Sequence, residues 1–407
     1  MRPRLFPVLA VGLLLLVQIE SGIAQSKPVP RVIMVGVNGM EWDLIRPLIM
    51  KGDMPNLAKV IAQGTYGKLQ TLSAPNCPKV YSAIATSTPP QENGITGFRV
   101  AGKTANTSML KRDTLASILS NHGVSVGLAN VPATFPAMPV NGYVVTGMLT
   151  RGKGCEDGIL CAPKLSEVQG GEPIYPSSLR SELLANVGDF RIDCLRMPSA
   201  QDLRSNAAKT VDDWLQQVSL VRTEQTKVFD YLLSHHPTDF TMMVQSCEDR
   251  TGHWLYPIQP HNVGYNSNVN SGHVEAFPDQ YRAFDKVLGT ILKYVDDRTY
   301  LFVISDHGIK PLREFEQQHM SMMGHDHGGD TPIIANHDFQ DGDDVPGVLI
   351  VMGPNIKHSE RLLGLNASVY DLVPTVLSLY GIKAPPQMRG RVLKELFEES
   401  LTANITP

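Results

Sequence analysis

The chain alternates between short runs that are apolar at almost every position and longer amphipathic segments. The apolar runs cover residues 31–37, 124–131, 240–245, 300–305 and 348–352. Strands of a parallel sheet have this composition because helices cover both faces of the sheet and no position faces water. The pattern therefore predicts buried strands rather than strands with one exposed face.

Segments with helical character lie between these runs. We expect helices over residues 44–62 with a break near Gly52–Pro55, 79–86 directly after Pro78, 112–121, 278–295 and 369–379. Strands that alternate with helices are typical of an α/β fold with a doubly wound, mainly parallel sheet. We predict that fold class.

One stretch interrupts the alternation. Residues 150–235 are rich in Gly, Pro and Ser, contain three of the five cysteines and have no long apolar strand. We interpret them as a cap region inserted over the sheet. The predicted organisation is a signal peptide (1–24), the first part of the core domain (25–149), the cap (150–235) and the second part of the core (236–407).

The N-terminus has the pattern of a secretory signal. Arg2 and Arg4 precede an apolar run over residues 5–17, and the small residues Gly22 and Ala24 follow. A membrane anchor is the alternative, but the apolar run is shorter than the roughly 20 residues that a spanning helix needs. We expect cleavage after Ala24, a periplasmic or secreted protein, and no stable membrane anchor.

Composition bears on partners. The chain has 407 residues, of which 42% are hydrophobic and 19% charged, with a formal net charge of −4. Proteins that bind nucleic-acid polymers usually show a basic excess, which is absent here. We therefore expect no nucleic-acid polymer as a partner. The sequence carries no signal for an oligomeric state.

Export also bears on the cysteines, because disulfides form in oxidising compartments. Cys155 and Cys161 flank a short loop that contains Gly158, and we expect them to pair. Cys247 is expected to be a core residue or half of a disulfide. Since five cysteines cannot all pair, at least one thiol remains.

Polar clusters follow three of the apolar runs. Asn38 follows the first run, Asp249 follows the run that ends at residue 245, and Asp306 and His307 follow the run that ends near residue 305. In open α/β sheets, ligand-binding groups gather beyond the carboxyl ends of the strands. Asp249 and His253 are four residues apart, a spacing that lets both bind one ion. A lone aspartate at a strand end is commonly a helix cap, so the prediction of a metal site rests on the repeated pattern.

Neighbouring charged residues support weaker assignments. Arg250 and Lys79 are equally compatible with a phosphate contact and with a solvated surface. Glu248 is expected to face solvent or to lie behind a metal ligand.

Several of these segments, in this order, resemble the type I phosphodiesterase/nucleotide pyrophosphatase family of the alkaline-phosphatase superfamily. The segments are Val32–Gly39, Met54–Leu57 with Gly64, Ala85-Thr86 with Pro90, Gly94 and Ile95, Asp249 with His253, Ser305–Gly308, Pro346–Val348 with Met352–Pro354, and Tyr370–Thr375. The resemblance runs from about residue 31 to residue 397, except for 150–235. It implies an alkaline-phosphatase-like sheet, a small-molecule phosphoester substrate and two divalent metal ions, with zinc expected.

The resemblance also implies a ligand set. One ion would be held by Asp249, His253 and His337, with His325 and His327 as the alternatives to His337. All three positions have the residue type that the family uses.

The second ion would be held by Asn38, Cys77, Asp306 and His307. Two of these depart from the family's pattern, which has an acid at the position of Asn38 and Thr or Ser as the nucleophile at the position of Cys77. An amide is a weaker zinc ligand than a carboxylate, whereas a thiolate is a good one. A thiolate at Cys77 would also return the negative charge that Asn38 lacks.

Cys77 has four possible roles. It is the nucleophile, a precursor of formylglycine as in sulfatases, a metal ligand only, or a buried cysteine in a decayed site. Formylglycine formation needs Pro or Ala two residues later and Arg four residues later, where this chain has Lys79 and Tyr81. The preferred function is hydrolysis of a phosphodiester with Cys77 as the catalytic residue. The alternatives are a catalytically weak metal- or ligand-binding relative and a formylglycine-dependent sulfatase or phosphonate hydrolase.

Overall fold

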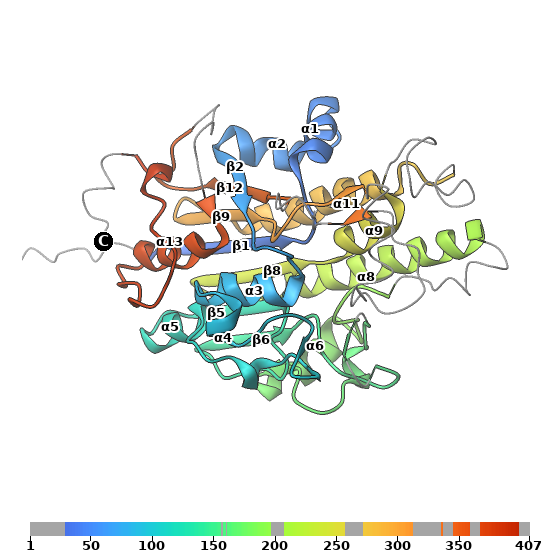
Figure 1. Ribbon diagram of the computed structural model, residues 1–407, viewed down its shortest axis with the longest axis horizontal. Helices are drawn as coiled ribbons and strands as arrows, with labels where there is room; N and C mark the ends of the chain where they lie inside the picture. The colour runs from blue at the N-terminus through green and yellow to red at the C-terminus, as the bar shows by residue number, and fades with distance from the viewer. Residues whose placement is uncertain are drawn as a thin grey trace, which may run out of the picture.

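A nine-stranded sheet organises the part of the chain that the structure describes (Figure 1). This computed structural model describes residues 29–155, 158–159, 161–196, 207–256, 272–311, 335–336, 345–358 and 367–398. The strands, in their order across the sheet, are β13 (Ala367–Ser368), β2 (Gly64–Gln70), β12 (Gly347–Met352), β9 (Thr299–Ile304), β1 (Arg31–Val37), β8 (Phe240–Gln245), β5 (Val126–Val131), β6 (Gly142–Thr146) and β7 (Ile174–Tyr175).

The centre of the sheet is parallel. Strands β9, β1, β8, β5 and β6 run in one direction, whereas β12 lies antiparallel to β9 and β7 lies antiparallel to β6. The predicted mainly parallel α/β sheet is confirmed. The direction of β12 could not be read from its apolar run, because a strand buried on both faces has the same composition in either direction.

Helices cover both faces of the sheet. On one face lie α3 (Cys77–Thr86), α5 (Leu115–Asn121) and α13 (Leu372–Leu379). On the other lie α1 (Trp42–Lys51), α2 (Pro55–Ala62), α6 (Ser177–Asn186), α8 (Ala207–His235) and α11 (Ala276–Ile291). The short helix α9 (Cys247–Leu255) follows β8 directly. Smaller elements are α4 (Pro90–Asn93), β3 (Arg99–Val100), β4 (Lys103–Thr104), β10 (Lys310–Pro311), β11 (Ala335–Asn336), and the 3-10 turns Thr107–Met109, Leu165–Glu167, Leu292–Tyr294, Val369–Asp371 and Lys394–Leu396.

Local capping explains where the helices begin and end. The predicted break in 44–62 is confirmed at Gly52, which ends α1 with a left-handed φ of 82°. Helix α3 begins two residues earlier than predicted, because Asn76 caps it and Pro78 lies in its first turn, where no N–H donor is needed. Helix α5 begins three residues later than predicted, because the side chain of Thr114 caps it.

The stretch 150–235 is more regular than its composition indicates. In its described part the strand is the two-residue β7, whereas residues 207–235 form the 29-residue helix α8. Val228, Phe229 and Leu232 of α8 are buried in the core on one face of the sheet. This part of the stretch therefore belongs to the core layer. The division of the chain at residues 150 and 235 stays a prediction.

Four of the five cysteines are paired. Cys155 bonds to Cys161, which confirms the predicted pair, and Cys194 bonds to Cys247. Cys77 is the free thiol and is buried. None of the helices that the structure describes has the length and hydropathy to cross a membrane, and the predicted signal peptide lies outside the described residues.

Candidate metal centre

The order of the strands brings the predicted site residues to one edge of the sheet. Strand β1 lies between β8 and β9, and the three run parallel. Asn38 follows β1, Asp306 follows β9, and α9 carries Asp249 just beyond β8. All three residues are at most 5% exposed. The repeated strand-end pattern in the sequence therefore corresponds to one buried cluster.

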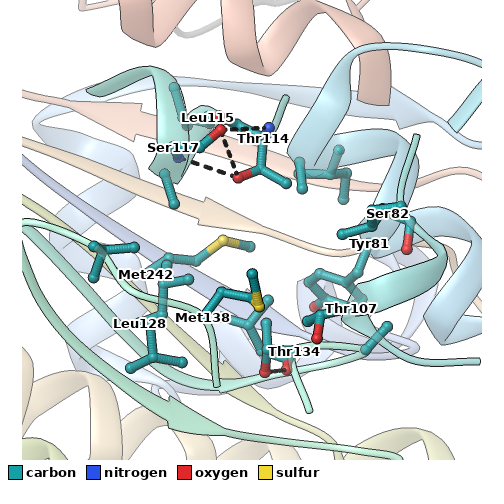
Figure 2. Close-up of a pocket in the computed structure, with 18 of the residues that line it drawn as sticks. Tyr81, Ser82, Thr107, Thr114, Leu115, Ser117, Leu128, Thr134, Met138 and Met242 are labelled. Carbon is teal, nitrogen blue, oxygen red and sulfur yellow. Dashed lines mark hydrogen bonds between the residues drawn. The ribbon is translucent and has the colours of Figure 1, made fainter. Parts of the chain in front are cut away.

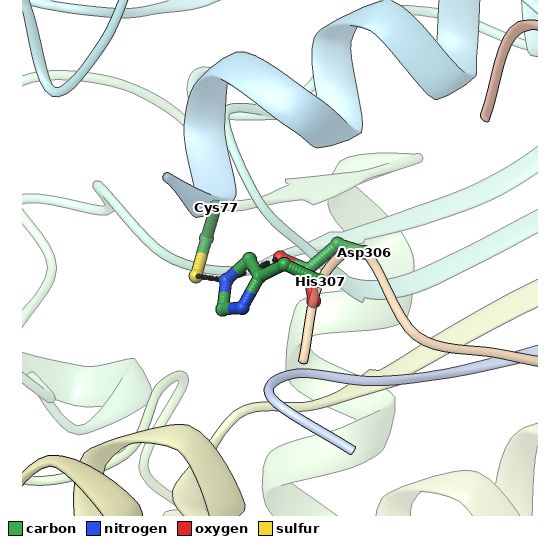
Figure 3. Close-up of side chains that lie close together, drawn as sticks. All are labelled: Cys77, Asp306 and His307. Carbon is green, nitrogen blue, oxygen red and sulfur yellow. Dashed lines mark hydrogen bonds and ion pairs between the residues drawn. The ribbon is translucent and has the colours of Figure 1, made fainter. Parts of the chain in front are cut away.

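Cys77 joins this cluster from the first residue of α3. Its Sγ lies 3.9 Å from Nε2 of His307, and that nitrogen lies 3.2 Å from Oδ2 of Asp306 (Figure 3). One ligand atom from each of the three residues lies within 4.8 Å of the others. Nδ1 of His307 is 3.0 Å from the carbonyl oxygen of Gly308, a contact that orients the ring and leaves Nε2 for the cluster.

These three residues fit a zinc ion. Thiolate sulfur, imidazole nitrogen and carboxylate oxygen are the donors that zinc takes in proteins. Both carboxylate oxygens of Asp306 are buried. Among the described residues, Nε2 of His307 is an ion-pair partner, at 3.2 Å from Oδ2. A buried carboxylate is costly unless a cation compensates its charge, and either a protonated His307 or a metal ion would do so. Asp306 thus has the environment of a metal ligand.

The electrostatics of the cluster favour a cation. Burial lowers the pKa of His307, but the Asp306 and Asp249 carboxylates outweigh burial and raise it to about 9. Burial raises the pKa of the Cys77 thiol well above its ordinary value, and the same two carboxylates raise it further. Burial and the carboxylates therefore disfavour the Cys77 thiolate, and a metal ion bound between these groups would favour it.

The Asn38 amide is held at both ends. The Tyr81 hydroxyl donates to its Oδ1 at 2.7 Å, and its Nδ2 donates to Sγ of Cys77 at 3.2 Å. Gly36 makes room for this arrangement, since a Cβ there would lie 2.5 Å from the Tyr81 oxygen. The oxygen predicted to bind a metal is therefore engaged with Tyr81, and the metal-ligand role of Asn38 stays a prediction. The sequence had singled out Tyr81 only as a departure from the formylglycine motif.

Asp249 and His253 form the other half of the predicted site. Nε2 of His253 lies 3.4 Å from Oδ1 of Asp249, and both side chains are buried. Gly39, with a φ of +73°, lets the end of β1 approach them, because a Cβ there would lie 3.0 Å from the Asp249 backbone. The third predicted ligand, His337, and its alternatives His325 and His327 lie outside the described residues.

The charged residues near the cluster are held by specific partners. Arg250 is buried and forms an ion pair with Asp193 at 2.6 Å, so a solvated position is wrong. Glu248 is buried and pairs with Arg222 at 2.7 Å. Lys79 donates to backbone carbonyls at residues 73 and 74. Sequence reasoning missed Asp193 and Arg222, which lie far from α9 in the chain.

An apolar pocket lies on the α3 and α5 side of the sheet (Figure 2). Its volume is about 120 Å³, and Leu128, Met138 and Met242 are among the lining residues. Tyr81 forms part of its wall. The described lining contains no charged side chain, so the pocket does not suit a phosphoester. The buried polar cluster at the sheet edge is the better candidate for the reaction site.

The model of the "Type I phosphodiesterase / nucleotide pyrophosphatase" family matches residues 32–378. The match covers the sheet, the strand-end residues and Cys77. The chain belongs to this family. The resemblance inferred from the ordered motifs is thereby confirmed.

Sulfatases are among the similar proteins. Arylsulfatase K of Xenopus laevis is 27% identical over 169 residues, which cover 37% of this chain and 28% of that protein. The structure of a 2-O GAG sulfatase (BT1596) aligns with a TM-score of 0.54 at 13% identity, over 90% of this chain and 74% of that one. A putative sulfatase from Bacteroides thetaiotaomicron aligns with a TM-score of 0.52 at 13% identity, over the same shares. At these identities the two structures show the alkaline-phosphatase-like fold alone.

Proposed function

We propose that this protein is an exported, zinc-dependent hydrolase of small-molecule phosphodiesters or pyrophosphates, with Cys77 as the nucleophile. The observation that carries the proposal is the convergence of Cys77, Asp306 and His307 in a buried cluster, with donor atoms within 4.8 Å of one another. Membership of the phosphodiesterase family supports the choice of substrate class.

Two groups of residues would hold metal ions. One ion would be held by Cys77, Asp306 and His307, together with Asn38. The other would be held by Asp249 and His253, together with His337. The ligand roles of Asn38 and His337 remain predictions. Zinc in these positions would neutralise phosphate charge and lower the pKa of the thiol.

The protein's own groups would act on phosphorus as follows. Cys77 acts as the thiolate, its proton having passed to solvent water, and its Sγ attacks phosphorus. The bond to the leaving oxygen breaks, and that oxygen takes a proton from water. Nδ2 of Asn38, which donates to the sulfur, orients Sγ. The N-terminus of α3 favours negative charge at Cys77, its first residue. Water then attacks the phosphorus, and the sulfur–phosphorus bond breaks to regenerate Cys77.

A substrate panel tests this function. The purified protein is assayed against an aryl phosphodiester, an aryl phosphomonoester, an aryl phosphonate and an aryl sulfate, with Cys77→Ala as the matched control. We expect the diester to be hydrolysed fastest and the variant to lose that rate. Zinc binding without turnover of any member would instead favour a catalytically weak metal-binding relative.

A sulfatase is the second candidate, because Arylsulfatase K matches part of the chain and this chain also has a cysteine at the nucleophile position. In that reaction class, formylglycine replaces the cysteine. Tyr81 holds Asn38 here, at the position where the modification motif has Arg. Intact mass distinguishes the candidates, since formylglycine exchanges sulfur and two hydrogens of Cys77 for one oxygen.

A further inference from the structure

Helix α9 carries Asp249 and His253 but has little stability of its own. It has nine residues, and every one of them is buried, including Glu248 and Arg250. Isolated helices of this length are not stable in water, and an internal glycine such as Gly252 weakens them further. The position of α9 must therefore come from its tertiary contacts.

Two residues of α9 are joined to residues 193–194, which lie between β7 and α8 in the chain. Cys247 forms a disulfide with Cys194. Arg250 donates to the Asp193 carboxylate at 2.6 Å and also to the carbonyl oxygen of Cys194. These contacts fix the beginning of α9 from the side of residues 193–194.

The third connection comes from α8. Arg222 donates to Glu248 at 2.7 Å and to Oε1 of Gln280 at 2.8 Å. Burial raises the pKa of Glu248, whereas the positive charge of Arg222 lowers it more than any other group does. The ring of Trp214 on α8 also packs edge-on against Trp254, with centroids 5.4 Å apart. Helix α8 thus supports α9 along its length.

These contacts constrain the rotation of α9 about its axis. Successive residues of an α-helix project about 100° apart, so Glu248 and Arg250 flank Asp249 on either side. Arg222 holds one flank and Asp193 holds the other. Asp249 is then directed toward the end of β1, where Gly39 packs against it.

We propose that Asp193, Cys194 and Arg222 are positioning residues that set the direction of Asp249 and His253, and with it the metal affinity of α9. The inference rests on the proposed function, because it assumes a metal at these two residues. It implies that full metal loading at α9 follows formation of the Cys194–Cys247 disulfide. Export to an oxidising compartment would then complete the site.

Two double variants and one control test the proposal. Cys194→Ala/Cys247→Ala removes the disulfide. Arg222→Met/Glu248→Leu removes the ion pair without leaving a buried charge unpaired, so the fold is retained. The control is Lys209→Met, which breaks an exposed ion pair with Asp213 on the same helix.

Zinc affinity is measured by competition with a chromophoric chelator, and unfolding temperature is measured on the same samples. Cobalt substitution separates the two metal positions, because only metal bound to Cys77 gives a sulfur-to-metal charge-transfer band. We expect both double variants to bind the α9 metal at least tenfold more weakly, with the Cys77 band unchanged, and Lys209→Met to match the parent. Hydrogen exchange of the metal-free proteins should also show faster exchange in α9 for both double variants.

Three results have distinct meanings. A parent protein that binds no zinc or cobalt would overturn the proposed function and the inference with it. Two metals bound by both double variants as tightly as by the parent would overturn the inference alone. The inference would also be overturned if zinc affinity fell only in those double variants whose unfolding temperature fell too. A general loss of stability would then explain the weaker binding.

Discussion

The hydrogen bond from Tyr81 to Asn38 allows a quantitative prediction. The Tyr81 side chain is 1% exposed and Asn38 is fully buried, and the bond between them is 2.7 Å long. Tyr81→Phe would leave Oδ1 of Asn38 without this donor. Loss of a buried hydrogen bond that leaves its acceptor without a donor costs about 1–3 kcal/mol, and removal of the hydroxyl alone changes the packing little. We expect the free energy of unfolding to fall by that amount.

Denaturant unfolding of the metal-free protein measures the effect, and a double-mutant cycle assigns it to the bond. The cycle comprises Tyr81→Phe, Asn38→Ala and the double variant. If the bond has the strength inferred, the two single changes are non-additive by about 1 kcal/mol or more. A loss below about 0.5 kcal/mol for Tyr81→Phe, or additive effects in the cycle, would refute the reasoning.

Three further predictions concern the site. Asp249→Ala or His253→Ala should abolish hydrolysis and remove at least one bound metal; parental zinc content in either variant, measured by elemental analysis, would show the assignment to be wrong. Cys77→Ser should lose the ion that Asp306 and His307 also bind, and Asn38→Asp should change zinc affinity modestly. The double variant Asn38→Asp/Cys77→Thr should restore ordinary diesterase activity. If Cys77→Ser bound two zinc ions as tightly as the parent, Cys77 would instead be a buried cysteine in a decayed site. The pKa of His307 is raised to about 9 from 6.5. Its protonation therefore stabilises the metal-free fold fully below pH 6.5, and this stability is lost as the pH rises through 9. Thermal unfolding of the protein after metal removal by a chelator should show the loss across this range, and His307→Gln should not show it.

Local patterns in the sequence were sufficient for the sheet and its polar edge. Apolar runs located β1, β8 and β9, and the polar residues that follow them meet because parallel strands end at one edge. The Cys155–Cys161 pair was predictable because its loop is short. In each case the evidence lay within a few residues of the feature.

The supporting contacts could not be predicted, since they join residues that are distant in the chain. Arg222 and Glu248 are 26 residues apart, and Asp193 and Arg250 are 57 apart. Nothing local indicates which charges will be buried together. Helix α8 was missed for a different reason: the Gly, Pro and Ser content of residues 150–206 dominated the interpretation of the whole stretch.

We propose that the free thiol of Cys77 belongs to a metal site with Asp306 and His307. Cobalt(II) titration of the metal-free protein, followed by absorption spectroscopy, tests it most directly, because a thiolate ligand produces a charge-transfer band that nitrogen and oxygen ligands do not. We predict that this band appears in the parent, is absent in Cys77→Ser and weakens in Asp306→Asn. A parent protein that binds cobalt without the band would contradict the claim.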